Sequence, residues 1–532
     1  MSHQPVTYNR RQLFGAILGS VSPIQSLSVA PASTTPPIST IAFNRMGFGP
    51  SAGDLDAFNA LGENDLTRLY AYIEQQLNPE LIDDSACEAR ITEEIFPTIN
   101  KNRTALWTEH HQIKKQRGKP LSDMQRLKLL RAVHSKRQLV EVLVEFWHDH
   151  FSVHGAMTPI RSLITAYDRD VIRPNVLGNF REFLIANAKS PCMLFYLDNI
   201  SNRKQGPNEN YARELCELHT MGEAAYLGTM AQADVPGYPD APIGYVEDDV
   251  FEIAKCFTGW GVAKKASQGT VGEYRFFANK HETGAKSALG MTIPANQEGD
   301  KDALDILNFL ATHPATARHI ATKLCRRLIA DQVPADVVES AAAVFLEKSA
   351  EPDQLKHVVR HILQSEAFRT TWGSKFKRPF EVAVSALRAL GANATYAKSE
   401  GKTKKVLRSL SAGGHAAFGW TPPNGYPDVA GYWQGSNGFV ARWRMFNMMT
   451  VRSRNAETAT PDELITPNQI VDYWTDQIFG YPLSAEDRAT IVAFFADGGD
   501  PDAPLARNKK KYKKLIKSGV ALMLCSADFQ QR

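Results

Sequence analysis

Apolar side chains recur about every 3.6 positions along most of this chain, which is the period of an amphipathic helix. The pattern is clear over 121–149, where Leu127, Leu130, Val133 and Leu139 fall on one stripe. In the first half of the chain this spacing predicts helices over 54–77, 82–94, 121–149, 178–189, 208–220 and 247–258. In the second half it predicts helices over 302–312, 315–330, 335–348, 353–365, 378–390, 438–451, 466–479, 485–496 and 511–526.

Only one part of the chain gives a convincing strand signal. The run 274–277, Tyr-Arg-Phe-Phe, is rich in aromatic residues and has a candidate partner near 289–293. The predicted fold is therefore mainly α, a large multi-helix body with a small β insertion near 270–295. We expect an N-terminal helical region over 54–265, a β insertion over 266–300, and a C-terminal helical region over 301–532.

The N-terminus resembles a twin-arginine export signal. Arg10 and Arg11 precede a weakly apolar stretch, and Ala30-Pro31-Ala32 offers a small-x-small cleavage site. Residues 1–32 are thus predicted to be the signal and 33–53 a linker and entry segment, which places the protein in the periplasm or outside the cell. No run of eighteen apolar residues exists, so no transmembrane anchor is expected.

Composition is that of an ordinary globular protein, with 43% apolar and 22% charged residues among 532. The formal net charge of +4 is too small to predict a nucleic-acid partner. Basic clusters at 114–119, 402–405 and 509–514 are typical of solvated helix faces. The six cysteines form no CxxC pair, so neither a zinc ribbon nor a redox motif is indicated.

Two stretches concentrate groups that bind metals or move protons: 141–154, EVLVEFWHDHFSVH, and 208–222, NENYARELCELHTMG. We expect them to meet in the fold and form one site. Gly222 would end the second helix.

A divalent metal ion, namely iron, manganese or zinc, is one prediction from these stretches. Glu145 and His148 have the Glu-x-x-His spacing of four-helix di-metal proteins, although the second helix lacks the matching motif. A chance surface ion pair is the simpler alternative. His150, Glu217 and His219 stand at predicted helix ends, where unwinding would let residues two apart chelate one ion.

Proton transfer is the second chemistry that these residues suggest. Glu214 and Asp149 are the candidate catalytic carboxylates. Glu209, Arg213 and Glu217 have the i, i+4, i+8 spacing of a salt-bridge ladder.

The loop 281–286, His-Glu-Thr-Gly-Ala-Lys, offers His281 and Lys286 as a further acid, base or ligand and a cation for an anionic substrate. A turn whose polar groups only bond the backbone fits it equally well. Aromatic residues in the segments around Trp260, Trp420, Tyr426, Tyr432 and Trp433 suit a carbohydrate or small-ligand cleft, and suit core packing at least as well.

Several of these motifs together resemble one large bacterial family, domain of unknown function 1800. The motifs lie in order from about residue 43 to 528: RMGFGP at 45–50, FWHDHF at 146–151, NYARELCELHTMG at 210–222, FTGW at 257–260, HETGAK at 281–286, HPATAR at 313–318 and PNGYP at 423–427. The resemblance implies an exported protein that is often encoded beside an exported relative of the alkaline phosphatases and sulfatases. It implies no established chemistry.

Three functions follow as hypotheses. The first is an exported metal-dependent oxidoreductase or hydrolase. The second is a metal-free polysaccharide hydrolase or lyase that uses paired carboxylates. The third is a non-catalytic binding or assembly partner of an exported hydrolase, in which the polar motifs only specify the fold.

Overall fold

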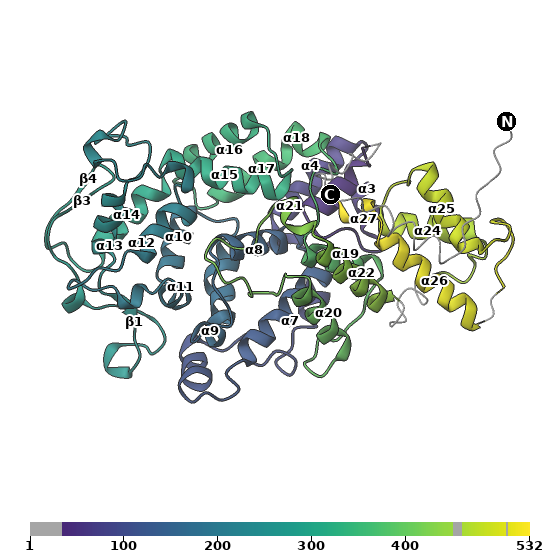
Figure 1. Ribbon diagram of the computed structural model, residues 1–532, viewed down its shortest axis with the longest axis horizontal. Coiled ribbons are helices and arrows are strands. Elements are labelled where there is room, and N and C mark those ends of the chain that lie inside the picture. The colour runs from purple at the N-terminus through teal and green to yellow at the C-terminus, as the bar shows by residue number, and fades with distance from the viewer. Residues whose placement is uncertain (1–34, 451–459, 507–508) are drawn as a thin grey trace.

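Helices dominate the computed structural model of this chain, which describes residues 35–450, 460–506 and 509–532 (Figure 1). They make up 57% of it and strands 4%, so the predicted mainly-α class is confirmed. The predicted signal 1–32 and the first residues of the linker lie outside the described residues. In the described part of the chain, no helix combines the length and the apolar character needed to cross a membrane.

The first half of the chain supplies the helices at the centre and at one end of the molecule in Figure 1. Their bounds are α2 (Ile38–Arg45), α3 (Asp54–Asn59), α4 (Asp65–Leu77), α5 (Ser85–Glu88), α6 (Arg103–Ala105), α7 (Lys119–His134), α8 (Gln138–His150), α9 (Ile160–Tyr167), α10 (Phe180–Ala188), α11 (Pro191–Tyr196), α12 (Asn210–Glu214) and α13 (Glu247–Cys256).

The long helix predicted over 121–149 is two helices, α7 and α8. At Ser135, directly after α7, the backbone becomes extended, with a ψ angle of 139°. The Asp84 carboxylate stabilises this break, because it accepts hydrogen bonds from the Ser135 hydroxyl (2.8 Å) and from the Lys136 amide (2.7 Å). Apolar periodicity continues across such a break, so the pattern alone does not reveal it.

The β insertion consists of two separate hairpin-like pairs. Strand β1 (Trp260–Val262) pairs antiparallel with β2 (Tyr274–Phe276), and β3 (Lys286–Ala288) pairs antiparallel with β4 (Met291–Ile293). The predicted partner of the 274–277 strand was therefore wrong. Its true partner follows α13 directly, and three-residue strands are too short to show a period of two.

The second half of the chain adds further helices, from α14 beside α13 at one end of the molecule in Figure 1 to α24, α25 and α26 at the other. Their bounds are α14 (Lys301–Ala311), α15 (Pro314–Leu328), α16 (Ala335–Glu347), α17 (Gln354–Gln364), α18 (Glu366–Thr370), α19 (Pro379–Ala389), α20 (Gly401–Ala412), α21 (Ala430–Trp433), α22 (Ser436–Thr450), α24 (Pro467–Ile478), α25 (Ala485–Ala496), α26 (Lys509–Leu524) and α27 (Ala527–Gln530). Most of these agree with the predicted bounds to within two residues, but α18, α20, α21 and α27 were not predicted, and neither was α9 in the first half.

Helices from both halves share one hydrophobic core. Helix α19 packs on α7, and α17 packs on α4. Buried charges join the halves as well, since Arg378 at the start of α19 reaches Asp149 at the end of α8 (2.6 Å). This union of distant segments positions the candidate site.

Candidate functional site

Helix α8 buries the acidic and imidazole stripe predicted for it. Glu145 is 2% exposed and forms ion pairs with Lys128 on α7 and with Arg378 (3.4 Å), and its carboxylate lies 3.5 Å from His415. Burial opposes ionisation of Glu145, but the charges of Lys128 and Arg378 and the hydrogen bond to His415 outweigh it and hold its pKa well below the usual range. Glu145 is therefore the fixed anion of a buried ion network.

His148, on the same helix, faces a different partner. Its Nε2 lies 2.9 Å from the Asp168 carboxylate, which also contacts Arg173 (3.3 Å). Asp168 belongs to a π-helical turn, η3 (Asp168–Ile172). Although burial opposes it, the charge of Arg173 and the bond to His148 lower the pKa of Asp168. Glu145 and His148 thus bind separate partners instead of a common ion.

The two stretches predicted to meet do pack against each other. His150 Nε2 donates a hydrogen bond to the His219 carbonyl oxygen (3.2 Å), and the two imidazole rings are 6.2 Å apart. A third imidazole joins them, since His319 on α15 lies 6.2 Å from the ring of His150 and donates from Nε2 to the Leu218 carbonyl (3.2 Å). Because both acceptors are carbonyl oxygens, the neutral rings of His150 and His319 carry their proton on Nε2.

All three imidazoles are neutral at physiological pH. Burial, with the nearby charge of Lys323, lowers the pKa of His219 and of His319 to about 3 and that of His150 well below its usual value. Both ring nitrogens of His219 are buried and have no hydrogen-bond partner among the described residues.

The predicted metal ligands do not converge on one point. Glu145 and His148 line the same small cavity but bind different partners, and the pair His150 and His219 has surroundings of its own. Among the described residues, Glu217 forms no hydrogen bond or ion pair with any of them. Within residues 35–450, 460–506 and 509–532, no group of three or more His, Cys, Asp or Glu side chains could hold a metal ion. Metal binding stays a prediction from sequence spacing alone.

The helix predicted over 208–220 changes its winding in the middle. Helix α12 ends at Glu214 and continues as a π-helical turn, η6 (Leu215–His219). Single π turns inside helices are common at functional sites. Gly222 follows with φ of 91°, so it ends the segment as predicted.

The predicted ladder of Glu209, Arg213 and Glu217 does not form. Arg213 instead makes two hydrogen bonds to the Glu247 carboxylate on α13 (2.6 and 3.0 Å). The π turn has more residues per turn than an α-helix, so Glu217 no longer lies one turn above Arg213 on the same face, as the second rung of the ladder requires.

Glu214 is the candidate carboxylate without a fixed role in the fold. It is half-buried and forms no hydrogen bond or ion pair with another residue of the described chain. Burial, and then the charge of Glu217, raise its pKa to about 7. Glu214 therefore keeps its proton to a higher pH than an exposed glutamate does.

The segment 415–433, which ends in α21 and which we call the aromatic loop, contacts Tyr196 on one side and Asp149 on the other. On one side the Tyr196 hydroxyl donates to the Thr421 carbonyl (2.5 Å), and burial and the charge of Glu214 raise the pKa of Tyr196 to about 12. On the other side the Tyr426 amide donates to the Asp149 carboxylate (3.4 Å).

The rings of this loop stack around His415. Its imidazole lies 4.4 Å from Tyr426 and 5.1 Å from Trp433, while Tyr432 packs on Trp433 (4.8 Å) and is 52% exposed. Trp420 continues the stack onto Tyr426 (4.9 Å). Below the loop a small cavity of about 20 Å³ reaches Glu145, Asp149 and His415. The aromatic residues thus serve packing and also offer exposed ring faces.

His281 and Lys286 belong to a separate buried cluster. His281 Nε2 (3.2 Å) and Lys286 Nζ (2.6 Å) both bind the Asp302 carboxylate, and Lys286 also donates to the carbonyls of Glu282 (2.7 Å) and Gly284 (2.8 Å). Both side chains are less than 5% exposed. The alternative of a loop held by its own polar bonds describes them better than a catalytic role.

A match to a known family covers almost all of this architecture. The family model described as "Protein of unknown function (DUF1800)" matches residues 41–531. The chain belongs to the DUF1800 family. No curated protein and no solved structure matches it.

Several site residues of this DUF1800 protein were not found from the sequence. Two of them lie shortly before the stretches and four come from the second half of the chain: Lys128, Tyr196, His319, Lys323, Arg378 and His415. His319 directly follows the motif at 313–318, which was the one available signal. The others carry no spacing relation to α8 or α12.

Proposed function

We propose that this DUF1800 protein is an acid–base enzyme, a hydrolase or lyase that acts on a polysaccharide. The observation that carries the proposal is Glu214, a half-buried carboxyl with no partner in the described chain, next to the second carboxylate Glu217 on a π turn. Buried charged groups in a fold normally have partners, as Glu145 does, so an unpaired carboxyl with a raised pKa is typical of a catalytic group.

The chemistry assigned to Glu214 follows from its proton. A carboxyl with a pKa of about 7 can give its proton to a leaving glycosidic oxygen at neutral pH and take one back afterwards. The charge of Glu217 is what such an acid needs beside it, because it keeps the proton on Glu214. The neighbouring Tyr196 and the exposed face of Tyr432 supply a hydroxyl and a ring surface of the kind that sugars stack on.

Asp149 is a positioning residue in this proposal. Its carboxylate holds Arg378 (2.6 Å) and the Tyr426 amide (3.4 Å), and so fixes the aromatic loop over the site. Metal-dependent chemistry has less support, since Glu145 and His148 are committed to ion pairs and the imidazoles of His150 and His319 to backbone carbonyls.

Export through a twin-arginine signal at 1–32 remains part of the proposal and agrees with a polymer substrate outside the cytoplasm. A co-encoded phosphatase- or sulfatase-like protein is then a proposed partner in the same compartment. A non-catalytic binding role is the alternative if Glu214 has no effect on turnover.

The experiment is a comparison of Glu214→Gln with Glu223→Gln on a panel of neutral and acidic polysaccharides. Glu223 is an exposed carboxylate nearby in sequence and serves as the matched control. New reducing ends report hydrolysis, and ultraviolet absorbance of unsaturated ends reports elimination. We expect Glu214→Gln to lower kcat by about a hundredfold or more while its melting temperature stays at or above that of the wild type. Full activity in Glu214→Gln, or none in the wild type on every polymer, would overturn the proposal.

A further inference from the structure

A cleft lined with lysines lies at the start of α7, away from the residues discussed so far. It has a volume of 460 Å³, which is within the range of ligand-binding pockets. The segment 94–97, the first turns of α7 and the segment 397–404, which leads into α20, form its walls. We call it the lysine cleft, after Lys119, Lys398 and Lys404.

The three lysines have no charge partner. None of them forms an ion pair with an acidic residue of the described chain. Asp123 also lines the cleft, but its carboxylate is already bound to Arg126 (2.5 Å) and to the Thr98 hydroxyl (2.7 Å). Glu94 is the second acidic residue of the lining, so the three lysines and Arg126 outnumber the two carboxylates and the cleft keeps an excess of positive charge.

Two independent features of the cleft favour a bound anion. Helix α7 begins at Lys119 and is 16 residues long, so its N-terminal end adds a partial positive charge. Arg126 is 3% exposed; its two terminal nitrogens bind Asp123 and the carbonyls of Ile95 and Tyr396, and its Nε alone is buried without a hydrogen-bond partner among the described residues. A buried guanidinium N–H without an acceptor is costly in a finished fold and is satisfied when an anionic oxygen or a bridging water enters.

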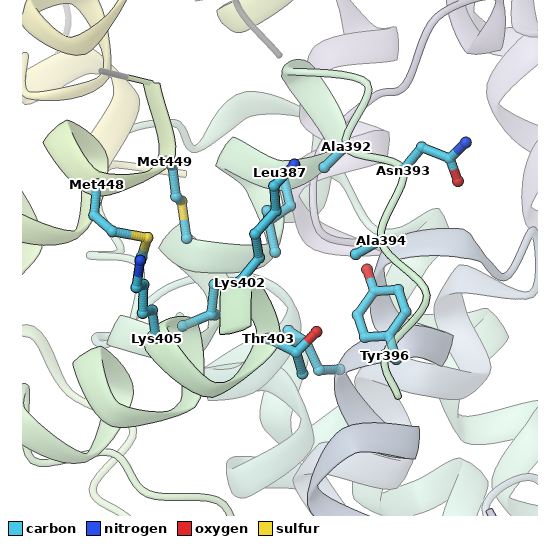
Figure 2. Close-up of a pocket in the computed structure, with 12 residues that line it drawn as sticks. Leu387, Ala392, Asn393, Ala394, Tyr396, Lys402, Thr403, Lys405, Met448 and Met449 are labelled. Carbon is cyan, nitrogen blue, oxygen red and sulfur yellow. The ribbon is translucent and has the colours of Figure 1, made fainter. Parts of the chain in front are cut away.

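The positive surface continues beyond the cleft on both sides. The loop before α7 adds Lys114 and Lys115, which are exposed. On the other side α20 adds Lys402 and Lys405, which Figure 2 shows at the rim of a small apolar cavity of about 50 Å³. Lysines on the loop before α7, in the cleft and on α20 together suit a polymer with repeated negative charges better than a single small anion.

The residues on this surface discriminate between classes of polymer. Single-stranded nucleic acid binding relies on aromatic platforms for the bases, and the described part of this surface exposes none. Membrane surfaces need several exposed apolar side chains, and of the large exposed ones only Ile113 lies here.

Lys119 and Lys128 are on the same helix, so the cleft lies roughly 14 Å from the ion pair of Glu145 by helix rise.

The geometry points to a binding surface for an acidic polysaccharide, with carboxylate or sulfate groups held in the lysine cleft and along α20. This inference rests on the proposed function in one respect: it makes an acidic polysaccharide the substrate class of that enzyme. The binding itself requires no turnover.

The test uses the full chain and a triple variant, Lys119→Ala, Lys398→Ala and Lys404→Ala. The control is Lys510→Ala, Lys511→Ala and Lys514→Ala on α26, which removes the same charge from another basic segment. Affinity is measured for alginate, a polyuronate, and for neutral dextran of similar length over a range of salt concentrations. We expect the cleft variant to bind alginate about tenfold more weakly or worse and with a shallower salt dependence, while the control binds like the wild type.

Three outcomes would overturn the inference: equal loss in both variants, equal affinity of the wild type for alginate and dextran, or tighter binding to single-stranded DNA or to anionic lipid vesicles than to alginate. Failure of the proposed function is seen separately. Glu214→Gln should bind alginate normally, so loss of binding only in the cleft variant supports the inference even if no polymer is cleaved.

Discussion

The backbone of Gly425 lies directly against that of Asp149. A β-carbon at position 425 would fall 2.0 Å from the Asp149 carbonyl oxygen, and the φ angle of Gly425 is 71°. Through this contact the PNGYP motif at 423–427 packs against the FWHDHF motif at 146–151, which lies nearly three hundred residues earlier in the chain.

Gly425→Ala should therefore destabilise the protein. The variant meets both the clash with Asp149 and the cost of a side chain in the left-handed region, and we expect a loss of about 2 kcal/mol or more in the free energy of unfolding. Gly431→Ala is the matched control, because it has open space around it. Thermal melts of the two variants give the comparison. Equal melting temperatures would mean that the loop does not rest on α8.

The proton on Glu214 should appear in the pH dependence of stability. Its pKa in the folded protein is about 7, above that of an exposed glutamate, so ionisation costs more in the folded than in the unfolded state. The wild type should therefore lose stability as the pH rises from about 4 toward about 7. Glu214→Gln does not lose this stability, because its amide does not ionise. The difference in melting temperature between variant and wild type should thus grow in favour of the variant with rising pH.

Glu223→Gln is again the control, and its difference from the wild type should stay constant over the same pH range. A constant difference for Glu214→Gln would show that Glu214 titrates as an exposed glutamate does. It would then not act as a neutral-pH acid.

Lys286 should prove structural. Lys286→Met leaves the buried Asp302 carboxylate without its closest cation, and we expect a loss of about 3–5 kcal/mol in unfolding free energy. Lys301→Met is the control, because the Lys301–Asp305 pair is exposed and should contribute about 0–1 kcal/mol. Adding Asp302→Leu to Lys286→Met should recover part of the loss. Normal stability with abolished turnover in Lys286→Met would instead restore the catalytic role predicted from the sequence.

The role of Glu145 separates the ion network from the metal hypothesis. Glu145→Gln leaves Lys128 without its buried counter-charge and removes one of the three carboxylates that surround Arg378, so it should lower the unfolding free energy by about 3–5 kcal/mol. Glu182→Gln, in an exposed pair with Arg181, should change it little. A chelator should leave the melting temperature of the wild type unchanged. Stoichiometric transition metal in the exported protein, together with a chelator-sensitive melting temperature, would contradict this account.

Most helices and the chemistry-bearing stretches could be predicted from the sequence. The spacing of apolar residues over α14 to α19 places each of these longer helices within two residues, apart from the short α18, and Gly222 ends its segment as expected. Local deviations were missed where a polar contact from elsewhere sets the backbone. The Asp84 carboxylate breaks the helix at Ser135, and the π turn after Glu214 removes the predicted ladder.

The sequence by itself determined the fold class, because helix periodicity depends on residues that are close together in the chain. It also determined the family, because the match to the family model runs along 41–531. Only the tertiary structure decided which groups are free to react. Glu145 and Glu214 look alike as residue types, yet one is surrounded by cations and the other lies half-buried beside Glu217. The pKa of a carboxyl depends on burial and on charges a few ångströms away in space, and those neighbours come from parts of the chain that no local pattern connects.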